Sequence, residues 1–539
     1  MGGHDGKEPR YRDAVFIEYA GSRVWDYLRY DEAGDLWIQD LRVSDAVRCY
    51  GTPLEIVDTT LIERRCDEWR ALCADVAADV GYPGRLRYLY ASKANMASEV
   101  AHAAYRSGWS AETSSQQDLV HLQWLQRNGL LPAGLRVVCN GFKLPAECYS
   151  LPDPAAPRAQ AVVALPGNTL SCSLRQLTYA EAIVDMARDG WDITPILDEG
   201  ELPAFTAAEA PDMRVGLRMK LGRARTASDL TALVSRFGTE REALLRESDA
   251  IAATKNLRLT TLHTMVGAAE SIPVDEYVAA LLLGMRMWLE LRRRHPTLRE
   301  VNLGGGMPPL SEPYDHRGVV GAYLRETQDA CRQAGLPAPD VTFELGSLVA
   351  EECGFHVFGV LQRKRNHTPT DDEPHTWAIV DGGLMAAIPD MLLLGKSFRF
   401  LAVQGADEPA ERVLLGDVTC DSDGRYPPKS FGPSGHVLLP TGAGPRHVLI
   451  QGVGAYQEIL AGVRGAHHCG LLEAMELILE RRADGRVHGR LLPRQTSADA
   501  AHLLGYVEAS QQPLRLALEA RGGAPGGGRA TPARGNPEG

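Results

Sequence analysis

The chain has 539 residues, which at roughly 150 residues per domain allows two to four domains. Its 44% hydrophobic and 23% charged residues are typical of a globular protein with a sizeable core. The formal net charge of −12 disfavours nucleic acid and anionic membranes as partners, because both attract basic surfaces. No apolar run reaches the ~20 residues of a membrane helix, and the first residues lack a signal peptide's apolar stretch. We therefore expect a cytoplasmic protein. The 10 cysteines show no C-x-x-C spacing, which indicates neither a zinc site nor a redox pair of that type.

Short apolar strands alternate with amphipathic helices between about residues 85 and 350. The expected strands are 87–91, 109–112, 136–139, 161–165, 192–197, 213–220, 259–266, 301–304 and 341–345. Apolar residues recur at spacings of three and four in 174–189 and 275–293, which predicts helices there. Strand and helix in alternation predict a parallel sheet, and eight or nine repeats favour a closed (β/α)8 TIM barrel.

The pattern of apolar and polar residues changes near residue 376. The segments 377–380, 412–415 and 436–439 are short, apolar and separated by Gly and Pro, which predicts an antiparallel β domain of sandwich or barrel type. Strands from 15–38 are expected to join it, so that both chain ends build this domain. The polar stretch 363–376 is expected to be an exposed loop.

The expected domain organisation has four parts. Residues 1–70 join the β domain, 71–350 form the barrel, 351–520 form the C-terminal β domain, and 521–539 form a disordered tail. The tail is expected to be disordered because Gly, Pro and Ala dominate it and little of it can be buried.

Three features at the ends of expected barrel strands are candidates for chemistry. Lys93 follows a strand, where partial desolvation can lower its pKa and let it form a Schiff base; the alternative is a surface lysine. Gly304, Gly305 and Gly306 follow another strand, and backbone N–H groups there can approach a phosphate, although glycine runs also form plain turns. Glu344 ends a third strand, where a carboxylate can keep a pyridinium nitrogen protonated or be an ordinary strand-end acid.

Nine motifs occur along the chain in an order that is typical of one family. They are YGTPL at 50–54, YASKAN at 90–95, ETSSQQDL at 112–119, VCNGFK at 138–143, SRFG at 235–238, NLGGG at 302–306, FELGS at 343–347, GDVTCDSDG at 416–424 and VGAYQEIL at 453–460. On these motifs the chain resembles the fold type III pyridoxal-phosphate decarboxylases, and among them most the biosynthetic arginine decarboxylases.

The resemblance implies roles for individual residues. Lys93 would form the internal aldimine with pyridoxal 5'-phosphate, and Glu344 would face the pyridine nitrogen, where the ring acts as an electron sink. The residues implied to contact the cofactor are Lys93, Glu112, Met265, Gly304, Gly305, Gly306, Glu344, Ser347 and Tyr456. Cys420 and Asp421 would come from a neighbouring subunit, the cysteine to return a proton and the aspartate, with Asp423, to bind the substrate's cationic end. Mg2+ is a candidate additional cofactor on the ground of the resemblance alone.

Three positions depart from the family pattern. Met265 stands where the family has a histidine stacked on the ring, Ala268 replaces a serine that contacts the phosphate, and Ser347 replaces an arginine that does so. His263 lies two residues before Met265, about 6.6 Å deeper on the same strand face, and is interpreted as a core histidine. The chain also lacks the family's helical insertion, with only 363–376 in its place.

The resemblance implies a carboxy-lyase that converts arginine, or a related basic amino acid, to agmatine or its analogue and CO2, as in polyamine biosynthesis. A homodimer or higher homo-oligomer with shared active sites is expected. Two alternatives remain. One is a specialised-metabolism pyridoxal-phosphate enzyme acting on another amino acid, and the other is a non-catalytic decarboxylase paralogue.

Overall fold

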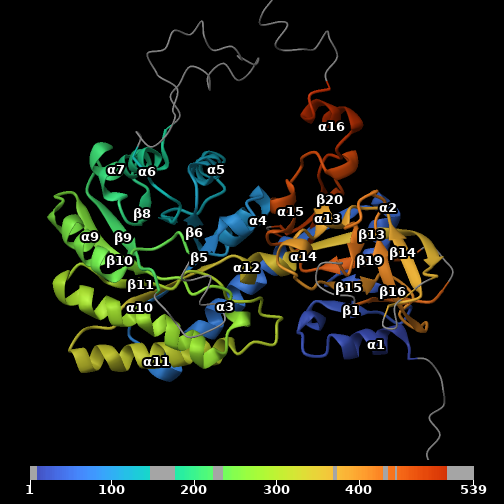
Figure 1. Cartoon of the computed structure of the whole chain (residues 1–539), viewed down its shortest axis with the longest axis horizontal. Helices are drawn as coiled ribbons and strands as arrows, with labels where there is room; N and C mark the ends of the chain where they lie inside the picture. The colour runs from blue at the N-terminus through green and yellow to red at the C-terminus, as the bar shows by residue number, and fades with distance from the viewer. Residues whose placement is uncertain are drawn as a thin grey trace, which may run out of the picture.

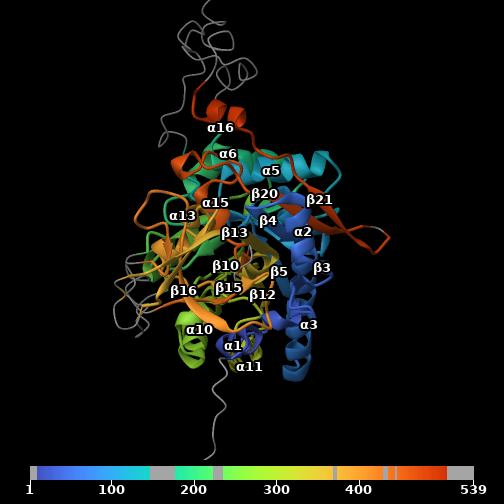
Figure 2. The same cartoon turned by 90° about the vertical axis from the view of Figure 1, so that its right-hand side faces the viewer.

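The computed structural model describes residues 9–145, 177–221, 235–367, 369, 373–428, 435–442, 446–482 and 484–506. Figure 1 shows two bodies side by side, a barrel ringed by helices and a sheet domain that contains the red C-terminal segments. Figure 2 views the molecule from the side of the sheet domain. The expected strand 161–165 and the expected disordered tail 521–539 lie outside the described residues.

The first body is a closed barrel of eight parallel strands, which confirms the predicted TIM barrel. Its strands are β5 (Leu86–Ala91), β6 (Ser110–Thr113), β7 (Arg136–Cys139), β8 (Asp192–Leu197), β9 (Met213–Arg218), β10 (Leu257–His263), β11 (Glu300–Asn302) and β12 (Asp340–Leu345). Neighbouring strands pair in sequence order, and β12 pairs with β5 while β9 pairs with β10, so no strand is left at an edge. Parallel strands covered by helices are buried on both faces, which explains their continuous apolar runs.

Helices surround the barrel. They are α3 (Thr59–Val80), α4 (Ser98–Arg106), α5 (Gln116–Arg127), α6 (Tyr179–Arg188), α7 (Leu202–Ala207), α9 (Arg241–Ala253), α10 (Val274–Arg294), α11 (His316–Ala334) and α12 (Ser347–Ala350). Local sequence sets several helix starts. Ser115 and Asp118 form a capping box at α5, and Thr178 and Glu181 form one at α6, so side chains satisfy backbone N–H groups that a first turn leaves free.

The second body is a ten-stranded sheet. Its strands are β4 (Leu54–Asp58), β13 (Gly354–Arg365), β14 (Thr376–Val380), β15 (Arg399–Ala402), β16 (Ala410–Gly416), β17 (Arg425–Tyr426), β18 (Val437–Pro440), β19 (Arg446–Gln451), β20 (Met475–Arg481) and β21 (Val487–Leu491). The prediction of an antiparallel domain is wrong in part, because β14 pairs with β16 and β20 pairs with β4 in parallel. A strand that is remote in sequence from its partner can pair with it in either the parallel or the antiparallel direction.

The N-terminal segment contributes differently from the expectation. Part of 15–38 is helical, in α1 (Tyr11–Glu18), and its strands β1 (Leu28–Tyr30) and β2 (Leu36–Ile38) pair with β3 (Leu41–Arg42) in a separate three-stranded sheet. The N-terminal strand that does enter the large sheet is β4, between β13 and β20. The remaining helices are α2 (Val43–Tyr50), α13 (Leu384–Ala387), α14 (Asp390–Leu393), α15 (Gln457–Ala461) and α16 (Ser497–Leu503).

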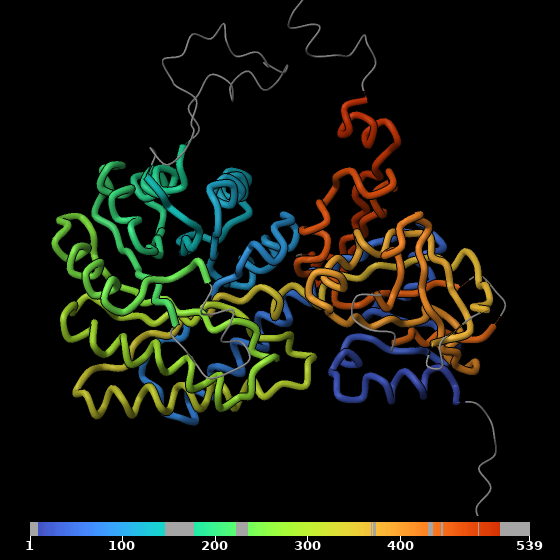
Figure 3. Tube along the Cα trace, viewed as in Figure 1, coloured from blue at the N-terminus to red at the C-terminus, as the bar shows by residue number. Residues whose placement is uncertain are grey.

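The two bodies are joined through α3, which leads from β4 into the barrel and packs against α4, α11 and β20. In Figure 3 this blue helix runs behind the green helices of the barrel, and Figure 2 shows it from the side. Arg65 of α3 is fully buried and pairs there with Glu352. The expected loop 363–376 is shorter than predicted, because β13 continues through Arg365. Within the part of the chain that the structure describes, no helix combines the length and apolar character needed to cross a bilayer.

Candidate active site

Polar side chains gather at the carboxyl-terminal ends of the barrel strands, where parallel barrels place their chemistry. They come from six strand ends around the barrel. They are Lys93 after β5, Glu112 on β6, Asn140 after β7, His263 at the end of β10, Asn302 at the end of β11 and Glu344 on β12. Glu112, His263, Asn302 and Glu344 are buried. Buried polar groups at one end of a barrel need partners, and these residues bond to one another.

Lys93 and Glu112 form an ion pair. The Lys93 Nζ lies 2.8 Å from Glu112 Oε2, and the carboxylate is fully buried while the lysine side chain is 46% exposed. Burial opposes the charged lysine, but the carboxylates of Glu112 and Glu344 outweigh it and raise the Lys93 pKa. The expectation of a lowered lysine pKa is therefore wrong for this arrangement, since two acids lie within reach of the ammonium.

Asn140 connects the two acids. Its Nδ2 atom donates to Glu112 Oε1 at 2.9 Å and to Glu344 Oε2 at 2.7 Å. Ser114 Oγ donates to the same Glu112 oxygen at 3.1 Å. Glu112 therefore accepts from a cation and two neutral donors, which fixes its position between β5 and β7.

Glu344 is held by three neutral donors. Asn302 Nδ2 donates to Oε1 at 2.6 Å, and Asn140 and His263 donate to Oε2. Burial opposes ionisation, but His263, Lys93 and the Asn302 amide lower the pKa of Glu344 to about 2. The Glu344 side chain is therefore a carboxylate at neutral pH, although it is only 4% exposed. A fixed negative charge is thus available at the centre of the barrel mouth.

His263 belongs to this network as well as to the core. Its Nε2 atom lies 3.1 Å from Glu344 Oε2, and among the described residues its Nδ1 atom has no hydrogen-bond partner. Burial lowers the His263 pKa, so the neutral ring carries its proton on Nε2 and donates it to the carboxylate. His263 precedes Met265 by two residues and was expected to lie deeper in the barrel. Its ring lies beside Glu344.

The glycine loop after β11 folds closely against the strand ends. Gly304 and Gly306 have φ values of +67° and +100°, which side chains rarely adopt. A Cβ on Gly305 would lie 2.4 Å from the Glu344 carbonyl oxygen, so a side chain has no room there. Among the described residues the Gly306 N–H has no hydrogen-bond partner.

Met265 lies over this loop. The Gly305 N–H donates to the Met265 Sδ at 3.3 Å, and a Cβ on Gly304 would lie 2.6 Å from the same sulfur. The Met265 side chain is 36% exposed at the barrel mouth. The thioether thus occupies one of the backbone donors of the glycine loop.

Tyr456 reaches the barrel from the sheet domain. It precedes α15 with a φ of +68°, and its N–H donates to the Ala94 carbonyl at 2.7 Å, beside Lys93. Burial raises the Tyr456 pKa, although Lys93 opposes this, so its hydroxyl remains a donor. Ser347 begins α12 directly after the strand that carries Glu344.

Cys420, Asp421 and Asp423 lie apart from these residues, in the loop between β16 and β17. Cys420 is exposed, and the Asp421 carboxylate lies 3.3 Å from His468 Nε2. The Asp423 N–H donates to Asp421 Oδ1 at 2.9 Å. Within the described part of the chain, no hydrogen bond or ion pair joins this loop to the Lys93 network.

Three members of the network were missed as functional residues in the sequence. Asn140 and Asn302 lie inside the VCNGFK and NLGGG motifs, and His263 ends a predicted strand. Their position at strand ends was the available signal, since polar side chains there face the barrel mouth.

Comparison with known proteins places this site in context. No family model matches the chain. It is 23% identical to a biosynthetic arginine decarboxylase of Thermosynechococcus vestitus over 61% of this chain and 50% of that protein. It is 26% identical to a diaminopimelate decarboxylase of Corynebacterium efficiens over 66% of this chain and 69% of that protein. The chain thus spans only about half the length of the arginine decarboxylase it matches.

Solved structures share the fold. The biosynthetic arginine decarboxylase of Campylobacter jejuni superposes with a TM-score of 0.69 at 17% identity, covering 95% of this chain and 94% of that one. The diaminopimelate decarboxylase of M. jannaschii in complex with L-lysine gives 0.68 at 15% identity, covering 89% and 99%. The resemblance to the fold type III decarboxylases, which are pyridoxal-phosphate enzymes, is therefore confirmed in sequence similarity and in fold.

The residues at the barrel mouth fit pyridoxal phosphate. The lysine can reach an aldehyde, and the buried Glu344 carboxylate can face a ring nitrogen. The close-packed glycine loop offers the Gly306 N–H to a phosphate, and Tyr456 lies beside Lys93. The fit lacks the bidentate arginine contact, because Ser347 occupies that position.

Proposed function

We propose that this chain, which resembles the fold type III decarboxylases, is a pyridoxal-phosphate-dependent α-decarboxylase of a basic amino acid. Arginine is the first candidate substrate, with agmatine and CO2 as products. The observation that carries the proposal is the convergence of Lys93, Glu112 and an ionised Glu344 at one end of the barrel. A carboxylate kept charged in the interior suits a protonated ring nitrogen.

When bound, the cofactor supplies an electron sink for the pair left at the α-carbon as CO2 departs. The negative charge of Glu344 would stabilise a proton on the ring nitrogen of the bound cofactor. His263, Asn302 and Asn140 hold the carboxylate in place and direct both its oxygens. Such a preorganised charge needs no rearrangement during the reaction.

Lys93 is proposed to bind the cofactor covalently through Nζ. That atom must lose a proton before it can act as a nucleophile, and the free chain favours the protonated form. Glu112 Oε2, at 2.8 Å, is placed to accept the proton. Asn140 and Ser114 then hold Glu112 in this position.

Cys420 and Asp421 are proposed to complete the site of a second subunit. Their loop is accessible on the sheet domain and makes no bond to the Lys93 network of the same described chain. The cysteine would return a proton to the α-carbon, and the two aspartates would pair with the substrate's cationic end. We therefore propose that the protein forms a homodimer or a higher homo-oligomer.

Diaminopimelate is a second candidate substrate. The similarity to diaminopimelate decarboxylases, at 26% identity to the Corynebacterium efficiens protein, is as strong as that to the arginine enzymes. Met265 and Ser347 alter the surroundings of the ring and phosphate, and this favours a test of several substrates.

The test is CO2 release by purified full-length protein with added pyridoxal phosphate. Arginine, ornithine, lysine and diaminopimelate are supplied separately, and the product amine is identified by mass spectrometry. Release from arginine alone supports the first proposal, and release from diaminopimelate alone supports the second. Cofactor bound covalently without CO2 from any of the four substrates would overturn both and favour another amino acid. The absence of covalent cofactor would favour a non-catalytic paralogue.

A further inference from the structure

We propose that the sheet domain binds a divalent transition-metal ion of the zinc class between Glu55, His356 and Glu458. These residues lie outside the barrel mouth, and the proposal does not depend on decarboxylase activity. One nitrogen or oxygen ligand atom from each of the three lies within 4.8 Å of the others. An ion at their centre would join segments that are far apart in the sequence.

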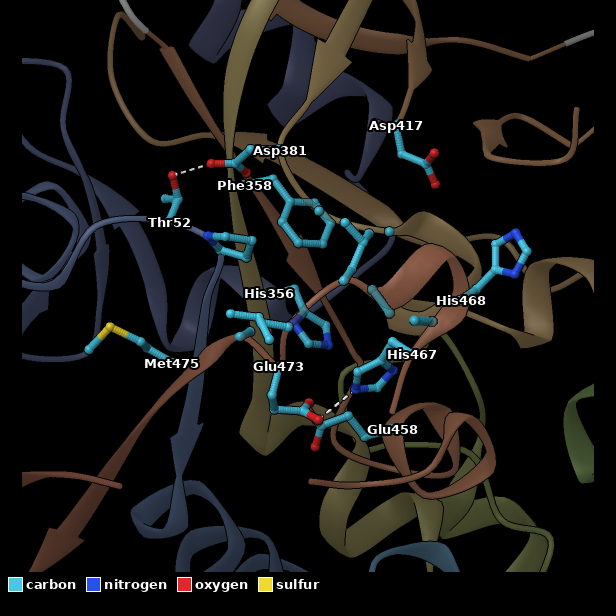
Figure 4. A pocket seen from close by; sticks show the side chains of 18 of the residues that line it. Thr52, His356, Phe358, Asp381, Asp417, Glu458, His467, His468, Glu473 and Met475 are labelled. Atoms are coloured by element: carbon cyan, nitrogen blue, oxygen red, sulfur yellow. Dashed lines mark hydrogen bonds and ion pairs between the residues drawn. The ribbon is translucent and has the colours of Figure 1, made fainter. Parts of the chain in front are cut away.

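Secondary structure brings the three together. Glu55 on β4 and His356 on β13 are direct partners in an antiparallel pair, so their side chains project from the same face of the sheet. Glu458 comes from α15 (Gln457–Ala461), and its carboxylate lies beside these two side chains. Figure 4 shows His356 and Glu458 directed toward each other, with His467 and Glu473 close by.

The three side chains are buried and incompletely bonded. Glu55 and His356 are each 4% exposed, and Glu458 is 9% exposed. Among the described residues, neither ring nitrogen of His356 has a hydrogen-bond partner, and neither do Glu55 Oε2 and Glu458 Oε1. A buried polar atom without a partner costs about 1–3 kcal/mol. A metal ion would bond directly to these unpaired atoms.

Charge in the surroundings supports the same conclusion. Glu476 lies beside Glu55 on β20 but is neutralised by Arg464, which donates to it at 3.0 and 2.7 Å. Glu473 pairs with His467. Among the described residues no ion pair joins Glu55 or Glu458 to a cation, and Arg464, which acts on Glu458 from a distance, is paired with Glu476 and Glu99. Two buried carboxyl groups therefore lie close together beside a histidine. Buried charges are generally paired with an opposite charge or bound to a metal.

The donor set indicates the class of ion. Imidazole nitrogen and carboxylate oxygen are both ligand types that Zn2+ binds, and three protein ligands leave a fourth tetrahedral position for water. Mg2+ favours oxygen ligands and retains most of its waters, so it suits this set less well. A cavity of about 270 Å3 is lined by His356 and Glu458, together with Phe358, His467 and Met475, among others. It offers room for the water and a path for the ion.

The test uses the full-length protein, treated with a chelator and dialysed. Metal content after incubation with Zn2+ is measured by plasma mass spectrometry, and Zn2+ affinity by calorimetry. Melting temperature is recorded with and without Zn2+. We expect one tightly bound ion per chain and a higher melting temperature with Zn2+, since an ion that binds only the folded state stabilises it. His356→Phe and Glu458→Gln should each weaken binding by about 100-fold or more.

Two features make the outcome decisive. Phenylalanine keeps the ring that stacks on Phe358, and glutamine keeps the size of Glu458, so both variants are expected to fold, as circular dichroism will show. His447→Phe, on neighbouring β19 and outside the cluster, is the matched control and should bind Zn2+ normally. Unchanged Zn2+ binding by His356→Phe would overturn the site. Failure of the unaltered protein to bind Zn2+ would do the same. An equal rise in melting temperature with Mg2+ would overturn the assigned ion class.

Discussion

The imidazole of His263 donates a hydrogen bond of 3.1 Å to the buried carboxylate of Glu344, two strands away in the barrel. Asn302, on the strand between them, donates to the other oxygen of the same carboxylate. Three consecutive strands thus stabilise one negative charge in the interior. Because hydrogen bonds to a carboxylate favour its ionised form, the charge does not depend on a bound ligand.

This charge predicts a specific loss of stability in acid. The pKa of Glu344 is lowered from its usual 4.5 to about 2 in the folded chain. Its contribution to stability is therefore complete above its usual pKa and is lost as the pH falls toward about 2. Glu344→Gln should lower the free energy of unfolding at neutral pH by up to about 3 kcal/mol, and this difference should shrink only below the usual pKa of 4.5. Urea denaturation from neutral pH downward measures this.

Glu351→Gln is the control for the loss of stability at low pH that is predicted from Glu344. Burial raises the Glu351 pKa in spite of its ion pair with Lys396, so its contribution is present at low pH and is lost as the pH rises. Its replacement should change the pH dependence in the opposite direction. If Glu344→Gln lost the same stability at every pH, the ionised state assigned to Glu344 would be wrong.

Most of the barrel could be predicted because its signals are local. Strand 136–139 and strand 192–197 match β7 and β8, and alternation with helices indicated closure into a barrel. The sheet domain was harder, because its pairing joins segments about 420 residues apart, as Glu55 and Glu476 show in the parallel pair β4–β20. No local pattern encodes the direction of such a pair.

The candidate site could likewise be predicted only where the signal is local in the sequence. The positions of Lys93, Glu112 and Glu344 at strand ends followed from sequence order and motifs. The raised pKa of Lys93 did not, because it depends on the carboxylate of Glu112, on the adjacent strand β6, rather than on partial exposure. The bond between His263 and Glu344 also depends on two strands that are remote in the sequence.

Lys93→Ala should abolish covalent attachment of pyridoxal phosphate. Borohydride treatment followed by mass spectrometry of peptides should locate the cofactor on Lys93 in the unaltered protein and on no lysine in the variant. Decarboxylation should fall by several orders of magnitude, because a covalent step is lost. Lys220→Ala, just beyond β9 at the same end of the barrel, is the control and should keep the cofactor. Cofactor found on another lysine in Lys93→Ala would contradict the assignment.

Met265→His should strengthen cofactor binding. The thioether now accepts the Gly305 N–H, and its removal frees this donor for the phosphate while an imidazole can stack on the ring. One added hydrogen bond predicts an affinity increase of roughly three- to tenfold, measured by fluorescence titration. Met265→Leu removes the sulfur without adding a ring and separates the two effects. Weaker binding or lower turnover in Met265→His would instead indicate that methionine suits a different reaction.

Cys420→Ala and Asp421→Ala should affect different kinetic constants. The cysteine is proposed to act after CO2 leaves, so its loss should lower kcat and leave KM nearly unchanged. Protonation at the wrong carbon would be detected as an aldehyde product. The aspartate is proposed to pair with the substrate's cationic end, so its loss should chiefly raise KM. Equal effects of both variants on KM would contradict the division of roles.

The exposed position of Cys420 also predicts a shared site, which mixing variant subunits can reveal. Lys93→Ala subunits, which are expected to be inactive, and Cys420→Ala subunits, which are expected to have a low kcat, should together restore up to about a quarter of the unaltered activity if random dimers form with independent sites. Restoration arises because one mixed site contains both unaltered residues. Subunit exchange is confirmed with a size tag and native mass spectrometry, and a mixture of two Lys93→Ala preparations is the control. No recovery after confirmed exchange would place Cys420 and Lys93 in the site of a single chain.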